Sequence, residues 1–151
     1  MIFLTHISFA LLMGLLYTKS LPYSVHSAVF IGIMCFASVF PDIDIGTSLI
    51  GRRVRPWNAF FRHRGFFHSI ICMIACTVAV FIVFHEADYA LAFLLGFASH
   101  LALDSLTPAG LALFWPSSFS PKGKFRTGGL FDWSLFFALV IIDTALVAGF
   151  L

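Results

Sequence analysis

Five long apolar stretches constrain the fold of this chain more than any other feature. They cover residues 1–17, 24–40, 66–84, 89–106 and 134–151. Apolar residues make up 60% of the chain and charged residues 11%, whereas soluble domains contain about 45–50% and about 25%. About 20 helical residues cross a bilayer core about 30 Å thick. The sequence therefore predicts an all-α, polytopic membrane helix bundle with about five transmembrane helices, which forms a single membrane-embedded domain over residues 1–151.

The basic residues are concentrated in two long connections, 41–65 and 107–133. These connections hold eight of the nine lysines and arginines, namely Arg52, Arg53, Arg55, Arg62, Arg64, Lys122, Lys124 and Arg126. If five helices alternate in direction, both connections and the N-terminus lie at one membrane face, and Lys19, Glu86 and Asp88 lie at the other. The positive-inside rule makes the basic face cytoplasmic. We expect a multi-pass protein of the inner (cytoplasmic) membrane with a cytoplasmic N-terminus.

Histidine and aspartate side chains are expected at the same cytoplasmic end. They are His6 in the first stretch, Asp42 and Asp44 after the second, His63 and His68 around the start of the third, and His100 with Asp104 near the end of the fourth. Ionisable residues inside apolar helices are costly and usually functional. Imidazoles and carboxylates that converge at one depth from four helices are typical of a metal site.

Each group also has a simpler interpretation. A single His6 in an apolar helix can be a hydrogen-bonded packing residue. The sequence "PDID" (41–44) can be a helix stop followed by a turn. His100 and Asp104, one helical turn apart, can form an intrahelical hydrogen bond. These interpretations do not explain why all the groups fall at one membrane face.

Three motifs carry a family resemblance. "FPDIDIG" (40–46), "HRGFFHS" (63–69) and "GFASHLALDSLTPAG" (96–110) occur in that order. Together they resemble the LexA-binding, inner-membrane-associated metal-dependent hydrolase family, over a span from about His6 to Trp115. The resemblance implies a membrane-bound, metal-dependent hydrolase.

A more distant similarity concerns the ligands. The order His, Asp, His and then His-x-x-x-Asp-x-x-x-Pro is similar to zinc-dependent phospholipase C. That similarity implies a metal-ligand set of His6, Asp42 or Asp44, His68, His100 and Asp104. Asp42 is favoured over Asp44 because it lies closer to the helix end. The phospholipases follow the proline with further histidines, whereas this chain has "PAG" (108–110) and no histidine after His100, so one or two metal ions are expected rather than three.

The expected cofactor is a divalent metal ion. Zinc is favoured, and manganese or iron also suits imidazole and carboxylate ligands. The remaining aspartate, Asp44, would orient water or act as a base. Arg62 and Arg64, which flank His63, would bind an anionic substrate oxygen, and His63 would support a metal ligand or lie at the rim of the site. The expected substrate is a phosphoester of a phospholipid or a lipid-linked molecule at the cytoplasmic face. No nucleic-acid partner is expected, and the oligomeric state is not predicted.

Two other functions remain open. A non-catalytic metal-binding or transport protein would carry polar residues through to the far side of the bundle, and Asp143 is the main hint of this within the helices. A membrane anchor would instead recruit a soluble regulator through Arg52, Arg53 and Arg55.

Overall fold

The computed structural model describes residues 1–20, 26–44, 65–117 and 119–149. These residues form helices α1 (Phe3–Ser20), α2 (Ser27–Ala37), α4 (Ile70–Phe84), α5 (Ala87–Ser105) and α6 (Leu130–Val147), with 3₁₀ turns η1 (Phe40–Asp44) and η3 (Phe66–His68). The described ranges contain no strand. Within the described residues, the prediction of an all-α protein with five helices is confirmed.

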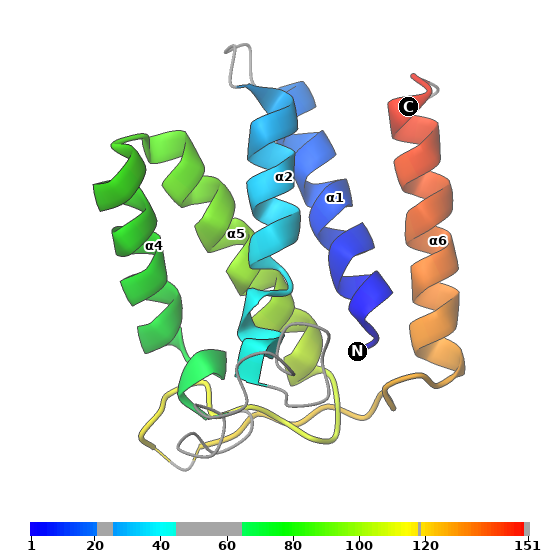
Figure 1. Cartoon of the computed structure of the whole chain (residues 1–151). Helices are drawn as coiled ribbons and strands as arrows, with labels where there is room; N and C mark the ends of the chain where they lie inside the picture. Colours follow the sequence, from blue (N-terminus) through cyan, green and yellow to red (C-terminus); the bar gives the residue numbers. More distant parts are fainter. Residues whose placement is uncertain (21–25, 45–64, 118, 150–151) are drawn as a thin grey trace.

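The helices stand side by side and alternate in direction along the chain. In Figure 1, α4 and α6 lie at the two outer positions, with α5, α2 and α1 between them. Helix α2 packs against α5, α5 packs against α4, and α6 packs against α1. The first residues, η1, η3, the end of α5 and the start of α6 all lie at one end of the bundle (Figure 1).

A glycine sets the close approach of α2 and α5. A Cβ atom added at Gly96 would overlap the carbonyl oxygen of Met34 and lie 2.9 Å from Cβ of Ala37. The side chains of Phe30, Met34 and Phe97 are fully buried around this contact. Because His100 lies one helical turn after Gly96, the same contact brings His100 to the end of α2.

Helices α4 and α6 each begin four residues away from the start of the predicted apolar stretch. The third stretch was expected to start at residue 66, but α4 begins at Ile70 because Ser69 caps it: the Ser69 hydroxyl accepts a hydrogen bond from the Cys72 N–H at 3.2 Å. Helix α6 begins at Leu130, before the expected residue 134, because the carboxylate of Asp132 accepts the Gly128 N–H at 2.9 Å. An acidic side chain in the first turn also suits the helix dipole.

The outer faces of α4 and α6 are apolar and exposed. The exposed large apolar side chains of α4 are Ile71, Ile74, Val78, Phe81, Ile82, Val83 and Phe84. Those of α6 include Leu130, Phe137, Ile141 and Val147. Among the described helices, α6 alone is both long and apolar enough to cross a membrane by itself, while Ser27–Asp42 and Ile70–Phe84 are apolar but shorter. Five membrane spans therefore stay a prediction.

Candidate metal centre

Five of the predicted site residues meet at the end of the bundle where the chain begins. Helix α1 contributes His6, η1 contributes Asp42, η3 contributes His68, and α5 contributes His100 and Asp104. The three imidazoles and Asp104 are buried, whereas the side chain of Asp42 is 21% exposed. The structure thus brings together residues that are far apart in the sequence, and their role as ligands stays a prediction.

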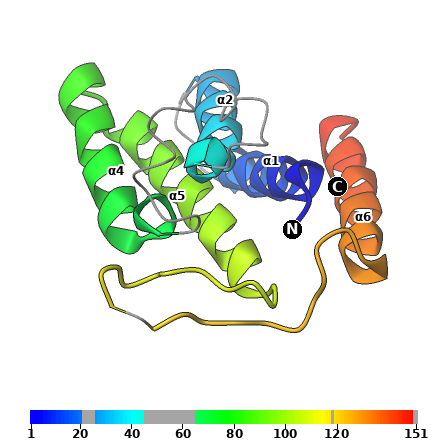
Figure 2. The same cartoon turned by 60° about the horizontal axis from the view of Figure 1, so that its bottom comes forward.

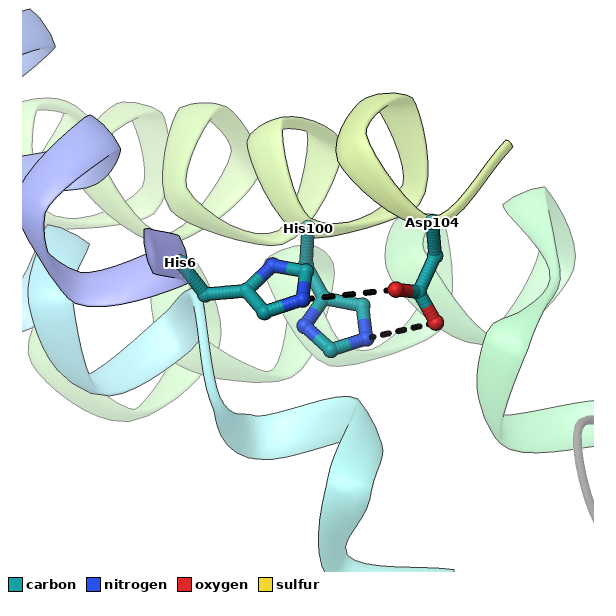
Figure 3. A group of neighbouring side chains, drawn as sticks. All are labelled: His6, His100 and Asp104. Carbon is teal, nitrogen blue, oxygen red and sulfur yellow. Dashed lines mark ion pairs between the residues drawn. The ribbon is translucent and has the colours of Figure 1, made fainter. Parts of the chain in front are cut away.

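His6, His100 and Asp104 form the first of two triads (Figure 3). The His6 Nε2 atom lies 3.3 Å from Asp104 Oδ1, and the His100 Nε2 atom lies 3.8 Å from Asp104 Oδ2. The rings of His6 and His100 are stacked, with centroids 4.2 Å apart. Both imidazoles therefore direct Nε2 at the same carboxylate.

Asp42, His68 and His100 form the second triad. The Asp42 Oδ1 atom lies 3.6 Å from His68 Nε2 and 3.7 Å from His100 Nε2, and the two Nε2 atoms are 3.4 Å apart. Ligand atoms on one tetrahedral zinc ion, with bonds of about 2.0–2.1 Å, lie about 3.4 Å apart. The donor set and its spacing fit a divalent ion. His100 belongs to both triads, and its Nε2 atom has one lone pair. This atom can therefore bind a single ion, and the two triads cannot use it for two separate ions.

A backbone carbonyl orients His100 for this role. The His100 Nδ1 atom lies 2.7 Å from the carbonyl oxygen of Ser38, the C-cap residue of α2. The carbonyl can only accept, so Nδ1–H is the donor and the Nε2 lone pair faces the two aspartates. Metal-binding histidines generally have such a partner on the other ring nitrogen.

A third carboxylate fixes the first turn of α1. The side chain of Asp132 is fully buried, and it accepts hydrogen bonds from the Ile2 N–H at 2.9 Å, the Thr5 hydroxyl at 2.7 Å and the Gly128 N–H at 2.9 Å. The amino group of Met1 donates to Asp104 Oδ1 at 2.7 Å. The bonds to Ile2 and Thr5 hold the residues just before His6. Asp132 therefore supports the position of His6, although it belongs to neither triad.

The motif after Asp104 ends α5 and turns the chain. The Thr107 hydroxyl donates to the Asp104 carbonyl at 2.8 Å. Gly110 has a φ of +65°, a conformation that favours glycine. The Gly123 N–H donates to the Thr107 carbonyl at 3.0 Å and fastens the returning connection to the end of α5.

The other predicted residues lie outside this description. Asp44 belongs to η1, but its side chain is not among those described, and His63 and Arg64 fall outside the described residues. Sequence reasoning missed Ser38, Thr5 and Asp132. Asp132 alone had a usable signal, because an acidic residue shortly after Gly128 and Gly129 at the start of an apolar run suits a helix N-terminus.

A protein-family model matches almost the whole chain. The family model described as "YdjM inner membrane protein" matches residues 1–150. The chain belongs to the YdjM inner membrane protein family. Membership supports an inner-membrane location. The metal-dependent hydrolase activity and the similarity to phospholipase C that were expected from the motifs stay predictions.

Curated relatives include inner membrane protein YdjM of Escherichia coli (strain K12), which is 37% identical over 87 residues, 52% of this chain and 44% of the relative. The YdjM protein of Shigella flexneri has the same values. YvsG of Bacillus subtilis (strain 168) is 31% identical over 85 residues, 54% of this chain and 53% of the relative. The chain thus spans about half the length of the curated relatives it matches. No solved structure matches the chain.

Proposed function

We propose that this member of the YdjM family is a multi-pass inner-membrane hydrolase that depends on a divalent metal ion and cleaves a phosphoester of a phospholipid or lipid-linked substrate at the cytoplasmic face. The observation that carries the proposal is the cluster of His6, Asp42, His68, His100 and Asp104 at one end of the bundle. Buried histidines and carboxylates at ligand spacing are difficult to explain by packing alone.

The multi-pass arrangement is supported by the outer surface. Large apolar side chains are exposed on both outermost helices, α4 and α6, as they are on lipid-facing helices. The short helix α2 fits a bundle whose helix ends dip into a polar site or a locally thinned bilayer. A reporter fused after residue 151 should lie on the side of the membrane away from the cytoplasm. A reporter on the cytoplasmic side would contradict the proposed orientation, in which the N-terminus is cytoplasmic.

The five clustered residues would hold the metal ion. When bound, it would act as a Lewis acid and activate water near neutral pH. Ser38 keeps the His100 lone pair directed at the site, and Asp132 supports the helix turn that carries His6. Zinc is the favoured ion, and manganese or iron is also compatible with these donors.

An accessible side of the cluster supports catalysis over a closed structural site. Four of the five side chains are buried, and Asp42 is the partly exposed member. Structural metal sites are closed by protein ligands, whereas catalytic sites keep a position open to water and substrate. Substrate would approach past Asp42. By their positions in the sequence motifs, Asp44 would orient water and Arg64, with His63 next to it in the chain, would bind the anionic oxygen.

Metal content and turnover should be measured on the same preparations. We expect His100→Ala to lose both metal and hydrolysis of an anionic phospholipid. Arg64→Ala should keep the metal and lose turnover about 10²-fold, because guanidinium does not bind a cation but can stabilise transition-state charge. Metal-loaded protein that cleaves no phosphoester substrate would exclude the hydrolase proposal and leave the metal site standing.

One observation favours the transport alternative. Asp143, in the second half of α6, is 5% exposed, and its Oδ1 atom has no hydrogen-bond partner among the described residues. A buried carboxylate within an apolar helix is typical of ion pathways. The test is metal uptake into vesicles that contain the protein. Uptake that is lost in Asp143→Asn would favour transport, and no uptake by the wild type would favour the hydrolase.

A further inference from the structure

The connection between α5 and α6, residues 106–129, combines cations with aromatic side chains. It contains Lys122, Lys124 and Arg126 and no aspartate or glutamate. All three cationic side chains are exposed. Its exposed aromatic side chains are Phe114, Trp115, Phe119 and Phe125. The connection therefore carries three positive charges and a set of large rings that the bundle does not cover.

The connection is held at the end of the bundle that carries the metal centre. Its Leu113 carbonyl accepts the Ile70 N–H at 3.0 Å, at the start of α4. The rings of Trp115 and Phe66 meet edge to face, with centroids 5.3 Å apart. In Figure 2 the connection, coloured yellow to orange, runs as a band across this end of the bundle from α5 to α6.

The aromatic surface continues into the outer face of α6. The Phe125 and Phe131 rings are stacked, with centroids 3.7 Å apart. Leu130 is 87% exposed, and Trp133 is exposed beside it. The band of rings and cations thus merges with the apolar face of the one described helix that is long and apolar enough to cross a membrane by itself.

The interface between a membrane and water suits a surface on which cations, aromatic rings and an apolar helix face adjoin one another. Aromatic side chains favour the level of the lipid headgroups, and lysine and arginine next to a membrane helix attract anionic lipids. A soluble acidic protein would satisfy the cations but would leave the rings and the adjoining apolar face of α6 uncovered. The continuity of the two surfaces favours a bilayer.

We propose that residues 106–129 lie in the lipid headgroup region beside the metal centre and that Lys122, Lys124 and Arg126 bind the phosphates of anionic phospholipids. This inference is independent of hydrolysis and of metal binding. It assigns a lipid-binding surface that stands whether the cluster is catalytic, structural or a transport site.

The test compares full-length protein in nanodiscs of phosphatidylcholine alone and of phosphatidylcholine with phosphatidylglycerol. An amine-reactive reagent should modify Lys122 and Lys124 several-fold more slowly when phosphatidylglycerol is present, and high salt should remove the difference. Lys19, at the opposite end of α1, is the internal reference. Equal rates in the two lipids would overturn the proposal and favour an acidic soluble partner.

A second measurement uses variants. The triple variant Lys122→Gln/Lys124→Gln/Arg126→Gln should retain much less phosphatidylglycerol than the wild type when purified in detergent, because each charge near an anionic surface changes affinity about fivefold. The control variant Lys19→Gln should retain as much as the wild type. Undiminished retention by the triple variant would contradict the proposal, and the labelling result on wild-type protein does not depend on how the variant folds.

Discussion

The Nδ1 atom of His100 lies 2.7 Å from the carbonyl oxygen of Ser38, which ties helix α5 to the end of helix α2. This bond sets the tautomer of a histidine that belongs to both triads. Because the partner is a backbone carbonyl, no side-chain substitution at Ser38 removes it. The position of His100 therefore depends on how α2 and α5 pack.

Removal of the His100 side chain should empty the centre. In His100→Ala both triads lose a ligand, so metal content measured by elemental analysis should fall well below that of the wild type. His26→Ala is the matched control, because His26 is exposed at the opposite end of α2. Equal metal content in the two variants would refute the site.

Substitution of Gly96 should disturb the centre from a distance. A methyl group there overlaps the Met34 carbonyl oxygen and separates α2 from α5. We expect Gly96→Ala to destabilise the protein by about 1–3 kcal/mol, as measured by thermal unfolding in detergent, and to weaken metal binding.

The control for this prediction is Gly32→Ala on α2. A Cβ at Gly32 meets no atom within 4 Å. The change should be neutral or stabilise the helix by up to about 1 kcal/mol. If both alanine variants unfold at the same temperature, the tight contact at Gly96 is not needed.

The carboxylate of Asp132 should affect metal affinity through His6. Asp132→Asn keeps the size of the side chain but replaces one carboxylate oxygen with an amide NH2 group. That NH2 group then faces one of the three groups that donate a hydrogen bond to Asp132 in the wild type. The cost of a mismatched buried group is about 1–3 kcal/mol. We expect weaker zinc binding by chelator competition and little change in affinity for Asp88→Asn, an exposed acid in the first turn of α5. An unchanged zinc affinity in Asp132→Asn would remove Asp132 from the support of the site.

Metal affinity should fall as the pH is lowered. A protonated imidazole cannot bind a cation, so protons compete with the metal ion for the three histidine side chains. The dissociation constant for zinc should therefore rise as the pH is lowered. Chelator competition at several pH values measures it, and His26→Ala should show the same dependence. A flat profile would mean that the histidines are not ligands.

The helices and the location of the site could be predicted because both depend on strong local signals. The five apolar stretches determine where helices form, and alternating direction is enough to place His6, Asp42, His68 and His100 at one end. The sequence could not separate Asp42 from Asp44. The structure places the Asp42 carboxylate within 3.7 Å of two imidazoles, and the Asp44 side chain is not described.

The parts that sequence reasoning missed depend on contacts between distant segments. The Ser38 carbonyl carries no side-chain signal, so its bond with His100 follows only from the packing of α2 on α5. Asp132 and Thr5 are 127 positions apart, and no periodicity links them. His68 was expected at the start of a helix but lies in η3, because the Ser69 cap starts α4 one turn later.

The bond between Asp132 and Thr5 also sets an order of events in biosynthesis. The ribosome makes His6 before Asp132, and Asp132, which holds the turn beside His6, is made after all five clustered residues. A nascent chain halted before α6 would carry all five clustered residues and lack the carboxylate that supports His6. We expect the centre to reach full metal affinity only after α6 has emerged and docked beside α1.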